Sequence, residues 1–332
     1  MPLPLLSAIA AVSLLTLSAH PATAQAAPTR AGHAYPVTTI RIVVGQTAGG
    51  VSDMIARMVA HRLSEALKQS VIVENRAGAA GGIGTEIAVK AAPDGYTLLL
   101  SSAGPIVINP VLYPKLGYDP QRDLAPIAFI ATSPLVLVLH PTVPASTVKE
   151  LITLARTRKH RLSFGSGGSG SPPHVTAELF KVMTGVQMTH VPFKGSAPSV
   201  VALVGGQVDL SFSSVAITLP QIKAGRIRAL AVTSPRRSPV LPQLPTMVQA
   251  GLPGFESQQW FGLFGQAALP NETIQRLNGA ITRWLDSPEV RKRLSGEGAE
   301  PGSLTLDEFA AFIRSDATRW AKVIKLSGAT PD

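Results

Sequence analysis

The sequence predicts an α/β fold with largely parallel sheets, divided into two domains. Runs typical of strands alternate with runs typical of helices from residue 38 onward, as they do in α/β proteins. With 332 residues, the chain is long enough to bury a large core and to form more than one domain. Hydrophobic residues make up 45% of it and charged residues only 15%, which excludes an intrinsically disordered protein.

Residues 1–26 are predicted to form a secretory signal peptide. Residues 3–17 are an apolar core too short to span a bilayer, and the small residues near Ala24 and Ala26 fit two alternative cleavage sites. No Lys or Arg precedes this core, so an uncleaved apolar anchor is the alternative. No later stretch approaches the apolar length of a membrane helix. We therefore expect an exported protein.

The composition excludes several classes of protein. The chain has no cysteine, which excludes a disulfide framework, a thiolate metal site and a lipid-anchored Cys, and which fits a bacterial periplasm. Its seven histidines form no metal-binding motif, so we expect no metal and no cofactor. The net charge of +10 indicates a solvated basic surface or the steering of anionic ligands. An aromatic content of 5% argues against nucleic-acid binding.

The first part of the chain predicts three strands and two helices. Apolar residues at helical spacing, such as Ile55, Val59 and Leu63, place the first helix. The expected elements are a strand at 38–44, a helix at 52–67, a strand at 71–74, a helix at 81–91 and a strand at 97–101. A stretch rich in Pro and Tyr, 105–126, then leads to the next strand.

The rest of the chain continues the alternation and ends in helices. The expected elements are strands at 135–139, 162–164, 188–192, 208–213, 229–232 and 261–264, and helices at 147–156, 175–184, 196–203 and 219–224. The Pro- and Gly-rich residues 236–254 predict a long surface connection. Asn271 can cap a helix that runs to residue 284, and Thr305 with Glu308 matches a capping box for the last helix.

The order of these elements predicts a discontinuous first domain, residues 35–135 plus 258–332, with a second domain, 136–257, inserted into it. The chain would cross between the domains near Leu135 and return near Trp260. Two strands that cross at the floor of a cleft form a natural hinge for closure.

Two Gly-rich loops between a strand and a helix predict anion sites. One spans residues 165–174 and the other 45–53, and residues 101–104 form a third loop of small polar residues. A loop that enters a helix exposes unpaired backbone N–H groups at the positive end of the helix dipole. We therefore expect a cleft that holds a carboxylate-bearing molecule from both sides.

Three other functions were weighed against this interpretation. The run from Gly165 to Gly170 matches G-x-G-x-x-G, but the acidic residue of a dinucleotide site is missing from 185–195. An exported serine esterase could use Ser169 or Ser171 with His174, but the G-x-S-x-G elbow is absent. A structural or adhesion module would have no cleft ligand.

Several residues at these loops have both a structural and a functional interpretation. His174 either contacts the ligand or supports the loop from behind, and Ser52 can cap the first helix and also donate to the ligand. For Asp53 we favour capping, because its charge would repel an anion. Phe193 packs either on the ligand or in the core, and Lys194 is either solvated or in contact with the ligand.

The ordered segments of the chain together resemble the Bug family, the periplasmic receptors of tripartite tricarboxylate transporters. The first loop, at 44–57, resembles the family pattern V-P-F-x-x-G-G-x-x-D-x-x-A-R. The other matching segments are 73–78, 93–99, 112–113, 118–120, 165–166, 170–171 with His174, 190–195, 222–225, 229–234, 244–246 and 250–256. The resemblance covers the chain from about residue 35 to the C-terminus.

The resemblance implies a type II-like periplasmic binding protein that closes on its ligand like a flytrap and has no enzymatic activity. Family ligands are di- and tricarboxylates, acidic amino acids and aromatic acids, and the partner is a membrane permease or a signalling protein. We expect a monomer. The expected ligand-binding residues are Gln46, Ala48, Gly49, Gly50, Ser52, Asp53, Ser101, Ser102, Ala103, Ser166, Gly167, Ser169, Gly170, Ser171, His174, Phe193, Lys194 and Ser213.

The sequence departs from the family pattern at one important place. Gly45-Gln46 replaces the Pro-Phe of the family, and Thr47 follows. Gln46 adds an amide to the expected cleft, and the glycine is expected to loosen the loop. The identity of the ligand is therefore not transferable from a typical member.

Overall fold

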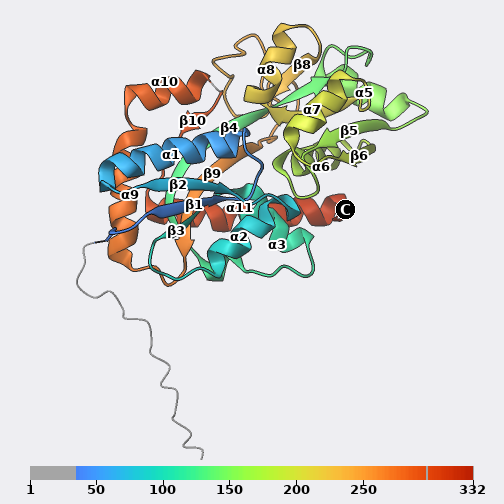
Figure 1. The fold of residues 1–332 in the computed structure, drawn as a ribbon. Helices are drawn as coiled ribbons and strands as arrows, with labels where there is room; N and C mark the ends of the chain where they lie inside the picture. The colour runs from blue at the N-terminus through green and yellow to red at the C-terminus, as the bar shows by residue number, and fades with distance from the viewer. Residues whose placement is uncertain (1–34, 297, 332) are drawn as a thin grey trace, which may run out of the picture. The chain divides into compact units, whose positions relative to one another are not determined.

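The computed structural model describes residues 35–296 and 298–331, so the predicted signal peptide, 1–26, and its cleavage sites lie outside the described residues. The strands are β1 (Ile40–Val44), β2 (Val71–Asn75), β3 (Thr97–Ser102), β4 (Leu124–Leu139), β5 (Leu162–Ser166), β6 (Met188–Pro192), β7 (Leu210–Ser214), β8 (Arg228–Val232), β9 (Gln258–Gln266) and β10 (Glu300–Pro301). They alternate with helices along most of the chain, which confirms the α/β class (Figure 1).

The helices vary widely in length. The α-helices are α1 (Val51–Leu67), α2 (Gly82–Val89), α3 (Asn109–Leu112), α4 (Pro120–Asp123), α5 (Val148–Thr157), α6 (Pro172–Thr184), α7 (Ser196–Val204), α8 (Val215–Lys223), α9 (Asn271–Leu285), α10 (Pro288–Gly296) and α11 (Leu306–Ser327). A 3₁₀ turn, η1 (Ala79–Gly81), precedes α2, and a π-helical turn, η2 (Gly104–Ile108), follows β3. None of the helices in the described part of the chain is long and apolar enough to cross a membrane.

The strands form one continuous sheet in the order β2-β1-β3-β9-β4-β7-β5-β6, and β8 and β10 also pair with β4. The two ends of the sheet are parallel: β1 pairs in parallel with β2 and β3, and β5 with β6 and β7. The centre is antiparallel, because β9 runs against both β3 and β4. The expectation of largely parallel sheets is therefore wrong for the centre, where the chain crosses and returns.

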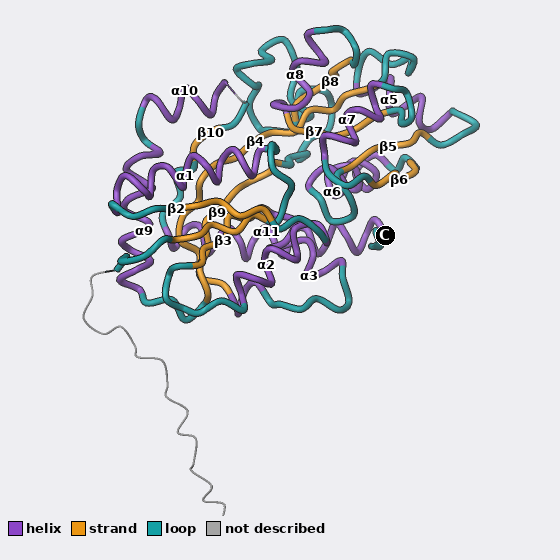
Figure 2. Tube along the Cα trace, viewed as in Figure 1, coloured by secondary structure: helices purple, strands orange, loops and turns teal. Residues whose placement is uncertain are grey.

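Strand β4 belongs to both halves of the sheet. Its residues 124–134 pair with β9, and its residues 135–139 pair with β7 and β8. Figure 2 shows β4 continuing from one group of strands to the other. One strand thus fixes the position of both parallel groups.

Thr233 joins the two crossing segments. Its buried hydroxyl accepts a hydrogen bond from the Leu135 backbone N–H at 2.9 Å and donates to the Ser257 carbonyl. The backbone N–H of Thr233 donates to the Leu135 carbonyl, and its own carbonyl accepts from Ser257. The point where β4 changes partners is therefore held by the backbone and the side chain of one residue.

Helices cover both faces of the sheet. On one face, α1 and α9 bury residues such as Leu63 and Ile281 against β1, β3, β4 and β9. On the other face, α11 packs against α6, and its Phe309 and Trp320 share one apolar core with Phe164 and Phe212. This second core is continuous from β3 to β5.

Several elements differ from the sequence expectation. The strand expected at 135–139 begins at Leu124, because Pro126 lies at a register shift with β9 and so does not interrupt the strand. The helix expected at 219–224 begins at Val215, although it contains Pro220. Asn271 does not cap α9, since Pro270 holds the N-cap position. Between α9 and the last helix, residues 288–296 form a short helix of their own, α10. The capping box at Thr305 is confirmed.

Replacing Thr233 with Val should destabilise the fold. The change keeps the shape but removes the hydroxyl, so that the buried Leu135 N–H loses a partner. We expect a loss of about 1–3 kcal/mol in the free energy of unfolding, measured by urea denaturation. Thr233→Ser retains the hydroxyl and should lose clearly less. Equal losses in the two variants would mean that the methyl group, not the hydroxyl, matters here.

Asp316 makes the stability depend on pH. The carboxylate accepts a hydrogen bond from Trp260 Nε1 at 2.8 Å, and burial raises its pKa although Trp260 and Arg319 oppose the change. A raised pKa in the folded state means that stability falls as pH rises through that pKa. Asp316→Asn, whose amide oxygen can still accept from Trp260, should raise the melting temperature at pH 7. The gain in melting temperature should vanish at a pH below the ordinary pKa of Asp, where Asp316 is protonated in both the folded and the unfolded state. A melting temperature of Asp316→Asn below that of the wild-type protein at pH 7 would contradict this prediction.

Candidate functional site

The predicted loops lie at the carboxyl ends of parallel strands, where α/β folds place their ligands. Helix α1 follows β1, α6 follows β5, and α8 follows β7. The N-caps of these helices are Gly50, Ser171 and Ser214, and none of them makes a side-chain capping hydrogen bond. The first N–H groups of α1 and α8 are thus not capped by protein side chains, whereas α6 begins with Pro172 and Pro173, which have no N–H to offer.

In the first loop, Asp53 is used by the loop itself. Its carboxylate accepts from the Gly49 N–H at 3.1 Å and from two nitrogens of Arg57 at 3.0 and 3.1 Å. Burial alone raises the pKa of Asp53, but the bonds from Arg57 and Gly49 lower it below its ordinary value. The carboxylate is therefore ionised and already paired. This favours the interpretation that Asp53 orders its own loop, while Ser52 lies buried beside it.

Gly45 is required by a close approach of two backbones. A Cβ atom at Gly45 would lie 2.5 Å from the Gly81 carbonyl oxygen and 2.7 Å from the Gly81 Cα. The expectation that this glycine loosens the loop is therefore wrong, because the glycine allows the loop to pack tightly. Four successive residues opposite it, 78–81, have positive φ, including Ala79 and Ala80. Such conformations cost energy for alanine, so the surrounding contacts hold them.

Gln46 lies between this segment and the rest of the site. Its main-chain oxygen accepts from Asn75, and its side-chain Nε2 lies beside Gly81. Its side-chain Oε1 is buried and has no hydrogen-bond partner. Ala48 and Gly49, farther along the loop, are exposed.

The third predicted loop follows β3. Ser101 and Ser102 end this strand, where they pair with Gly262 and Phe261 of β9. Ser101, Ser102 and Ala103 are all buried. The following turn, η2, brings Gly104 against the second loop, so that a Cβ on Gly104 would lie 3.2 Å from the Gly170 carbonyl oxygen.

The second loop is folded around the Ser166 hydroxyl. This hydroxyl accepts from the Gly168 N–H at 3.1 Å and lies 2.6 Å from His190 Nε2. The ring of His190 stacks on that of His174, with 4.1 Å between the centroids. Gly167 is half-buried beside Ser196. Two stacked imidazoles therefore support the loop.

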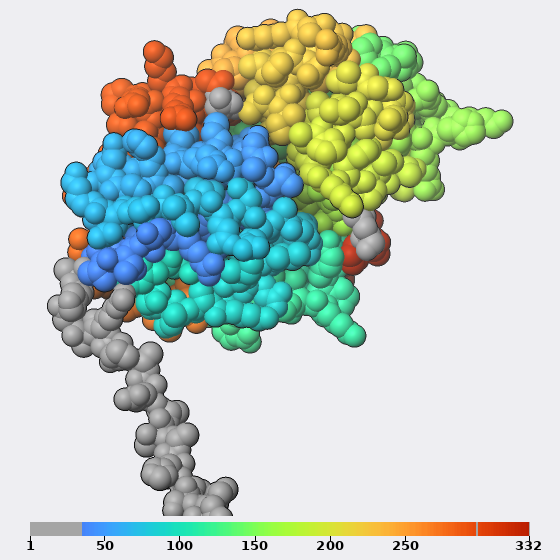
Figure 3. Space-filling view, in the orientation of Figure 1, coloured from blue at the N-terminus to red at the C-terminus, as the bar shows by residue number. Residues whose placement is uncertain are grey.

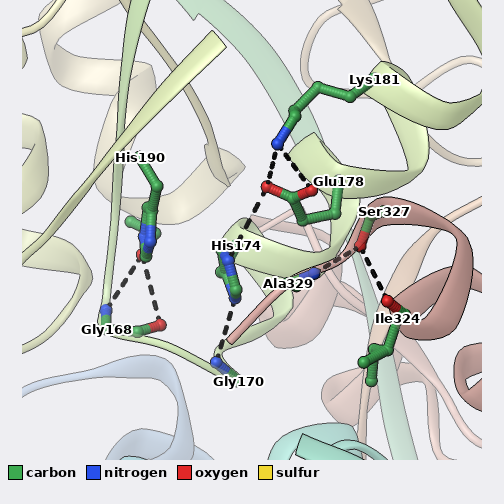
Figure 4. A network of polar contacts seen from close by, with 10 residues as sticks. Gly168, Gly170, His174, Glu178, Lys181, His190, Ile324, Ser327 and Ala329 are labelled. Atoms are coloured by element: carbon green, nitrogen blue, oxygen red, sulfur yellow. Dashed lines mark hydrogen bonds and ion pairs between the residues drawn. The ribbon is translucent and has the colours of Figure 1, made fainter. Parts of the chain in front are cut away.

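His174 faces the inside of its own loop. Its Nδ1 accepts from the Gly170 N–H at 3.1 Å, and its Nε2 lies 3.9 Å from Glu178, which pairs with Lys181 at 2.8 Å (Figure 4). Its side chain is only 3% exposed. These contacts favour the supporting interpretation over direct ligand contact.

The second loop meets the segment that follows the third loop. The Tyr113 hydroxyl donates to the Ser169 carbonyl at 3.1 Å. A Cβ on Gly170 would lie 2.6 Å from Asn109 Oδ1, and the φ of Gly170 is +81°, so a residue with a side chain would be strained there. The surface of residues 80–112, blue-green to cyan, and that of residues 165–205, green to yellow, meet along a seam (Figure 3). The structure thus brings the second and third loops together.

The remaining predicted residues differ in their surroundings. Phe193 is half-buried and packs against the apolar cluster around Val136 and Leu203. Lys194 is exposed. Ser213 is buried at the end of β7, beside the N-terminus of α8.

Buried polar atoms without a partner gather at these loops and helix ends. Hydrogen-bond partners are missing for the following side-chain atoms of the site region: Gln46 Oε1, Asn109 Oδ1, Ser133 Oγ, Ser171 Oγ, Ser199 Oγ, Ser213 Oγ and Ser214 Oγ. Most buried polar groups in folded proteins have partners, so such a set indicates a ligand or ordered water. Asn109, Ser133, Ser199 and Ser214 were not predicted. Of these, only Ser214 could have been found from the sequence, because it is a serine between an expected strand and an expected helix.

Two surface hollows lie away from the predicted residues. One of about 670 Å³ lies between β4, α9 and the start of α11, and one of about 150 Å³ lies beside α2 and Tyr118. Neither is lined by a predicted ligand-binding residue. Residues 35–296 and 298–331 contain no group of three or more His, Asp or Glu side chains suited to a metal ion.

Comparison with protein families gives a match over most of the chain. The model described as "Tripartite tricarboxylate transporter family receptor" matches residues 55–329. The match begins inside α1 and ends after α11, so it includes both halves of the sheet.

Three similar solved structures are receptors or carry carboxylates. Rpa4515 of Rhodopseudomonas palustris with adipate is 38% identical, with a TM-score of 0.85, over 90% of this chain and 100% of that one. MatC from the same organism, with bound malate, is 32% identical, with a TM-score of 0.81, over 87% and 100%. The periplasmic binding protein BugD is 32% identical, with a TM-score of 0.81, over 90% and 100%. The fold is therefore that of periplasmic solute-binding proteins.

Gly45→Ala should destabilise the protein, because the new methyl group would clash with the Gly81 backbone. We expect a loss of about 1–3 kcal/mol, measured by chemical denaturation. Gly279→Ala is the matched control: it lies within α9, and its nearest neighbour would be 4.0 Å away. The control should gain about 0.5–1 kcal/mol. An unchanged stability of Gly45→Ala would show that the first loop is not tightly packed.

Proposed function

We propose that this chain, which belongs to the tripartite tricarboxylate transporter receptor family, binds a small carboxylate between its three predicted loops. The observation that carries the proposal is the set of uncapped helix N-termini and unpartnered buried hydroxyls at one edge of the sheet. Helix N-termini favour anions, and hydroxyls donate to them. The adipate of Rpa4515 and the malate of MatC are carboxylates, which supports this class of ligand.

Neutral donors can supply enough affinity. A hydrogen bond to a charged group contributes about 1.5–3 kcal/mol. Micromolar binding requires a net of about 8 kcal/mol, and association itself costs about 4 kcal/mol or more. About five such bonds at Ser101, Ser102, Ser171 and the loop N–H groups would therefore suffice. A di- or tricarboxylate, an acidic amino acid and an aromatic acid are all compatible with such donors.

Closure of two domains would enclose the ligand. In this proposal residues 35–135 plus 258–332 form one domain and residues 136–257 the other, joined near Leu135 and Trp260. The change of partners along β4 supports a bend at this point. A ligand that bridges the two domains favours the closed state, because it gains contacts only there.

The receptor has no enzymatic role in this proposal. The comparisons give the esterase alternative no support, since the matching family consists of receptors. The Nδ1 of His174 also accepts from the Gly170 N–H, and its Nε2 lies 3.9 Å from Glu178.

The receptor would act in the periplasm as a monomer and deliver its ligand to a tripartite tricarboxylate-type permease or a signalling protein. The signal-peptide pattern of residues 1–26 and the periplasmic relative BugD support the location. The net charge of +10 would help to attract anionic ligands.

Ser171→Asp should abolish carboxylate binding. A carboxylate at the N-cap of α6 would repel an anion there, whereas Asp remains a good N-cap, so stability should change little. Ser171→Asn is the matched control, with the same size and no charge, and should keep most of the affinity. We would measure both by thermal shift with a panel of carboxylates, amino acids and sugars. Unchanged affinity in Ser171→Asp would remove this loop from the site.

A further inference from the structure

The end of α5 and the loop that follows it carry the densest run of basic residues in the described part of the chain. Residues 156–161, the basic loop, are Arg-Thr-Arg-Lys-His-Arg, and all of them are exposed. They belong to the light green projection at the right of the space-filling view (Figure 3). Blocks of like charge repel each other and are often found in segments that bind a partner.

The basic loop lies away from the candidate ligand site. Strand β5 begins at Leu162, directly after the basic loop, whereas the ligand loop 165–174 follows the same strand. The two loops therefore lie at opposite ends of β5. The charge of the basic loop is thus not part of the candidate ligand site.

Basic residues continue from this loop along the edge of the sheet. Arg228 of β8 pairs with Leu139 of β4, and the next residue, His140, donates its N–H to the Asp209 carbonyl at 2.9 Å. Asp209 in turn donates its N–H to the Ser163 carbonyl of β5 at 3.1 Å. The beginnings of β5, β7 and β8 thus lie side by side.

We define the basic edge as residues 140–161, Asp209 and residues 223–228. Its acidic residues are Glu150 and Asp209, and its basic residues are Lys149, Arg156, Arg158, Lys159, Arg161, Lys223, Arg226 and Arg228. With neutral histidines, its net charge of +6 is more than half of the +10 of the whole chain. The positive charge of the protein is therefore concentrated at one end of the second parallel group of strands.

Structural roles account for only part of this charge. Arg156 Nη2 donates to the Thr184 carbonyl at 2.6 Å, where α6 ends, and Arg228 Nη1 donates to the Ala145 carbonyl at 2.9 Å. Arg158 Nη1 lies 3.5 Å from Asp209. Among the described residues, no ion pair is formed by the exposed side chains of Lys159, Arg161, Lys223 and Arg226. These four charges repel each other, and an anionic partner would offset that repulsion.

The composition and shape of the basic edge favour a flat anionic surface as this partner. The core of a protein–protein interface is depleted in charge and rich in aromatic residues, but no large hydrophobic side chain is exposed within residues 140–161 or 223–228. Neither of the two hollows described above is lined by residues of this edge. A layer of lipid headgroups requires neither an apolar centre nor a hollow, because polybasic segments bind to it by charge.

We propose that the basic edge is a docking surface for a bilayer that carries anionic phospholipid headgroups. Arg158, Lys159 and Arg161 contact the headgroup phosphates first, because their loop projects from the protein. Contact through this edge leaves the ligand loop 165–174 uncovered at the other end of β5. The proposal goes beyond the proposed function and does not depend on the identity of the ligand.

The test measures how the purified protein sediments with lipid vesicles. One set of vesicles contains phosphatidylcholine alone, and the other contains phosphatidylcholine with one third phosphatidylglycerol. The loop variant combines Arg158→Gln, Lys159→Gln and Arg161→Gln. A double variant, Lys159→Gln with Arg161→Gln, leaves the pair of Arg158 and Asp209 intact and so guards against a loss of stability.

Helix α10 offers a matched control. Its exposed residues 291–293 are also Arg-Lys-Arg, so that their replacement removes the same side chains and the same charge from the other half of the sheet. The control variant combines Arg291→Gln, Lys292→Gln and Arg293→Gln. Melting temperatures of all variants check that they are folded.

The wild-type protein should bind the anionic vesicles at low salt and leave them as salt rises, because salt screens exposed charges. We expect the loop variant to bind them about a hundredfold more weakly and the double variant about tenfold to thirtyfold, since each Lys or Arg near an anionic membrane contributes roughly fivefold. The control variant should stay close to the wild-type protein. None of the proteins should bind the phosphatidylcholine vesicles through this edge.

Three results would overturn the docking surface. The first is a wild-type protein that ignores the anionic vesicles, which would leave an acidic protein or solvent alone as the partner of the basic edge. The second is equal binding to both kinds of vesicle, which would indicate apolar contact. The third is an equal loss in the loop variant and the control variant, which would mean that only the total charge of the protein matters.

Discussion

The crossing of the chain at Leu135, held by the Thr233 hydroxyl, is the constraint on which the rest of the structure depends. At this point β4 exchanges β9 for β7 and β8, and Thr233 supplies the hydrogen bond that the exchange leaves open at the Leu135 N–H. The same hydroxyl binds the Ser257 carbonyl, just before the chain returns in β9. The backbone pairing of β4 positions both parallel groups of strands, and Thr233 supplies hydrogen bonds at the point where its partners change.

The apolar core limits how the two halves can move. Phe309 and Trp320 of α11 belong to the same core as Phe164 and Phe212 of the other half. A bend about the crossing strands would keep the hydrogen bonds of Thr233, while α6 and α11 would have to slide against each other. Packed interfaces of this kind shift between discrete arrangements rather than deform continuously. The contact of Tyr113 with the Ser169 carbonyl belongs to the arrangement described here.

Local rules in the sequence predicted much of the fold and of the loops. The capping box at Thr305 and the Gly/Ser loop before α6 depend on residues close in the chain, so their patterns were sufficient. The roles of Gly45 and Thr233 depend on Gly81 and Leu135, which are distant in sequence. Asn109 Oδ1 and Ser133 Oγ stand out because these buried atoms have no hydrogen-bond partner, and only the folded chain shows such a lack.

The donors of the predicted site are neutral, which bears on the stability of the receptor after it releases its ligand. Apart from the exposed Lys194, the predicted site contains no Lys or Arg, and the charges of Asp53 and Arg57 neutralise each other. An anion held by hydroxyls and helix N–H groups leaves no buried cation unpaired when it departs. A buried Arg left alone would cost several kcal/mol, about the cost of breaking a buried ion pair. In the proposed site, neutral donors would therefore leave no unpaired cation in the empty receptor, while the net charge of +10 would still attract the anion from solution.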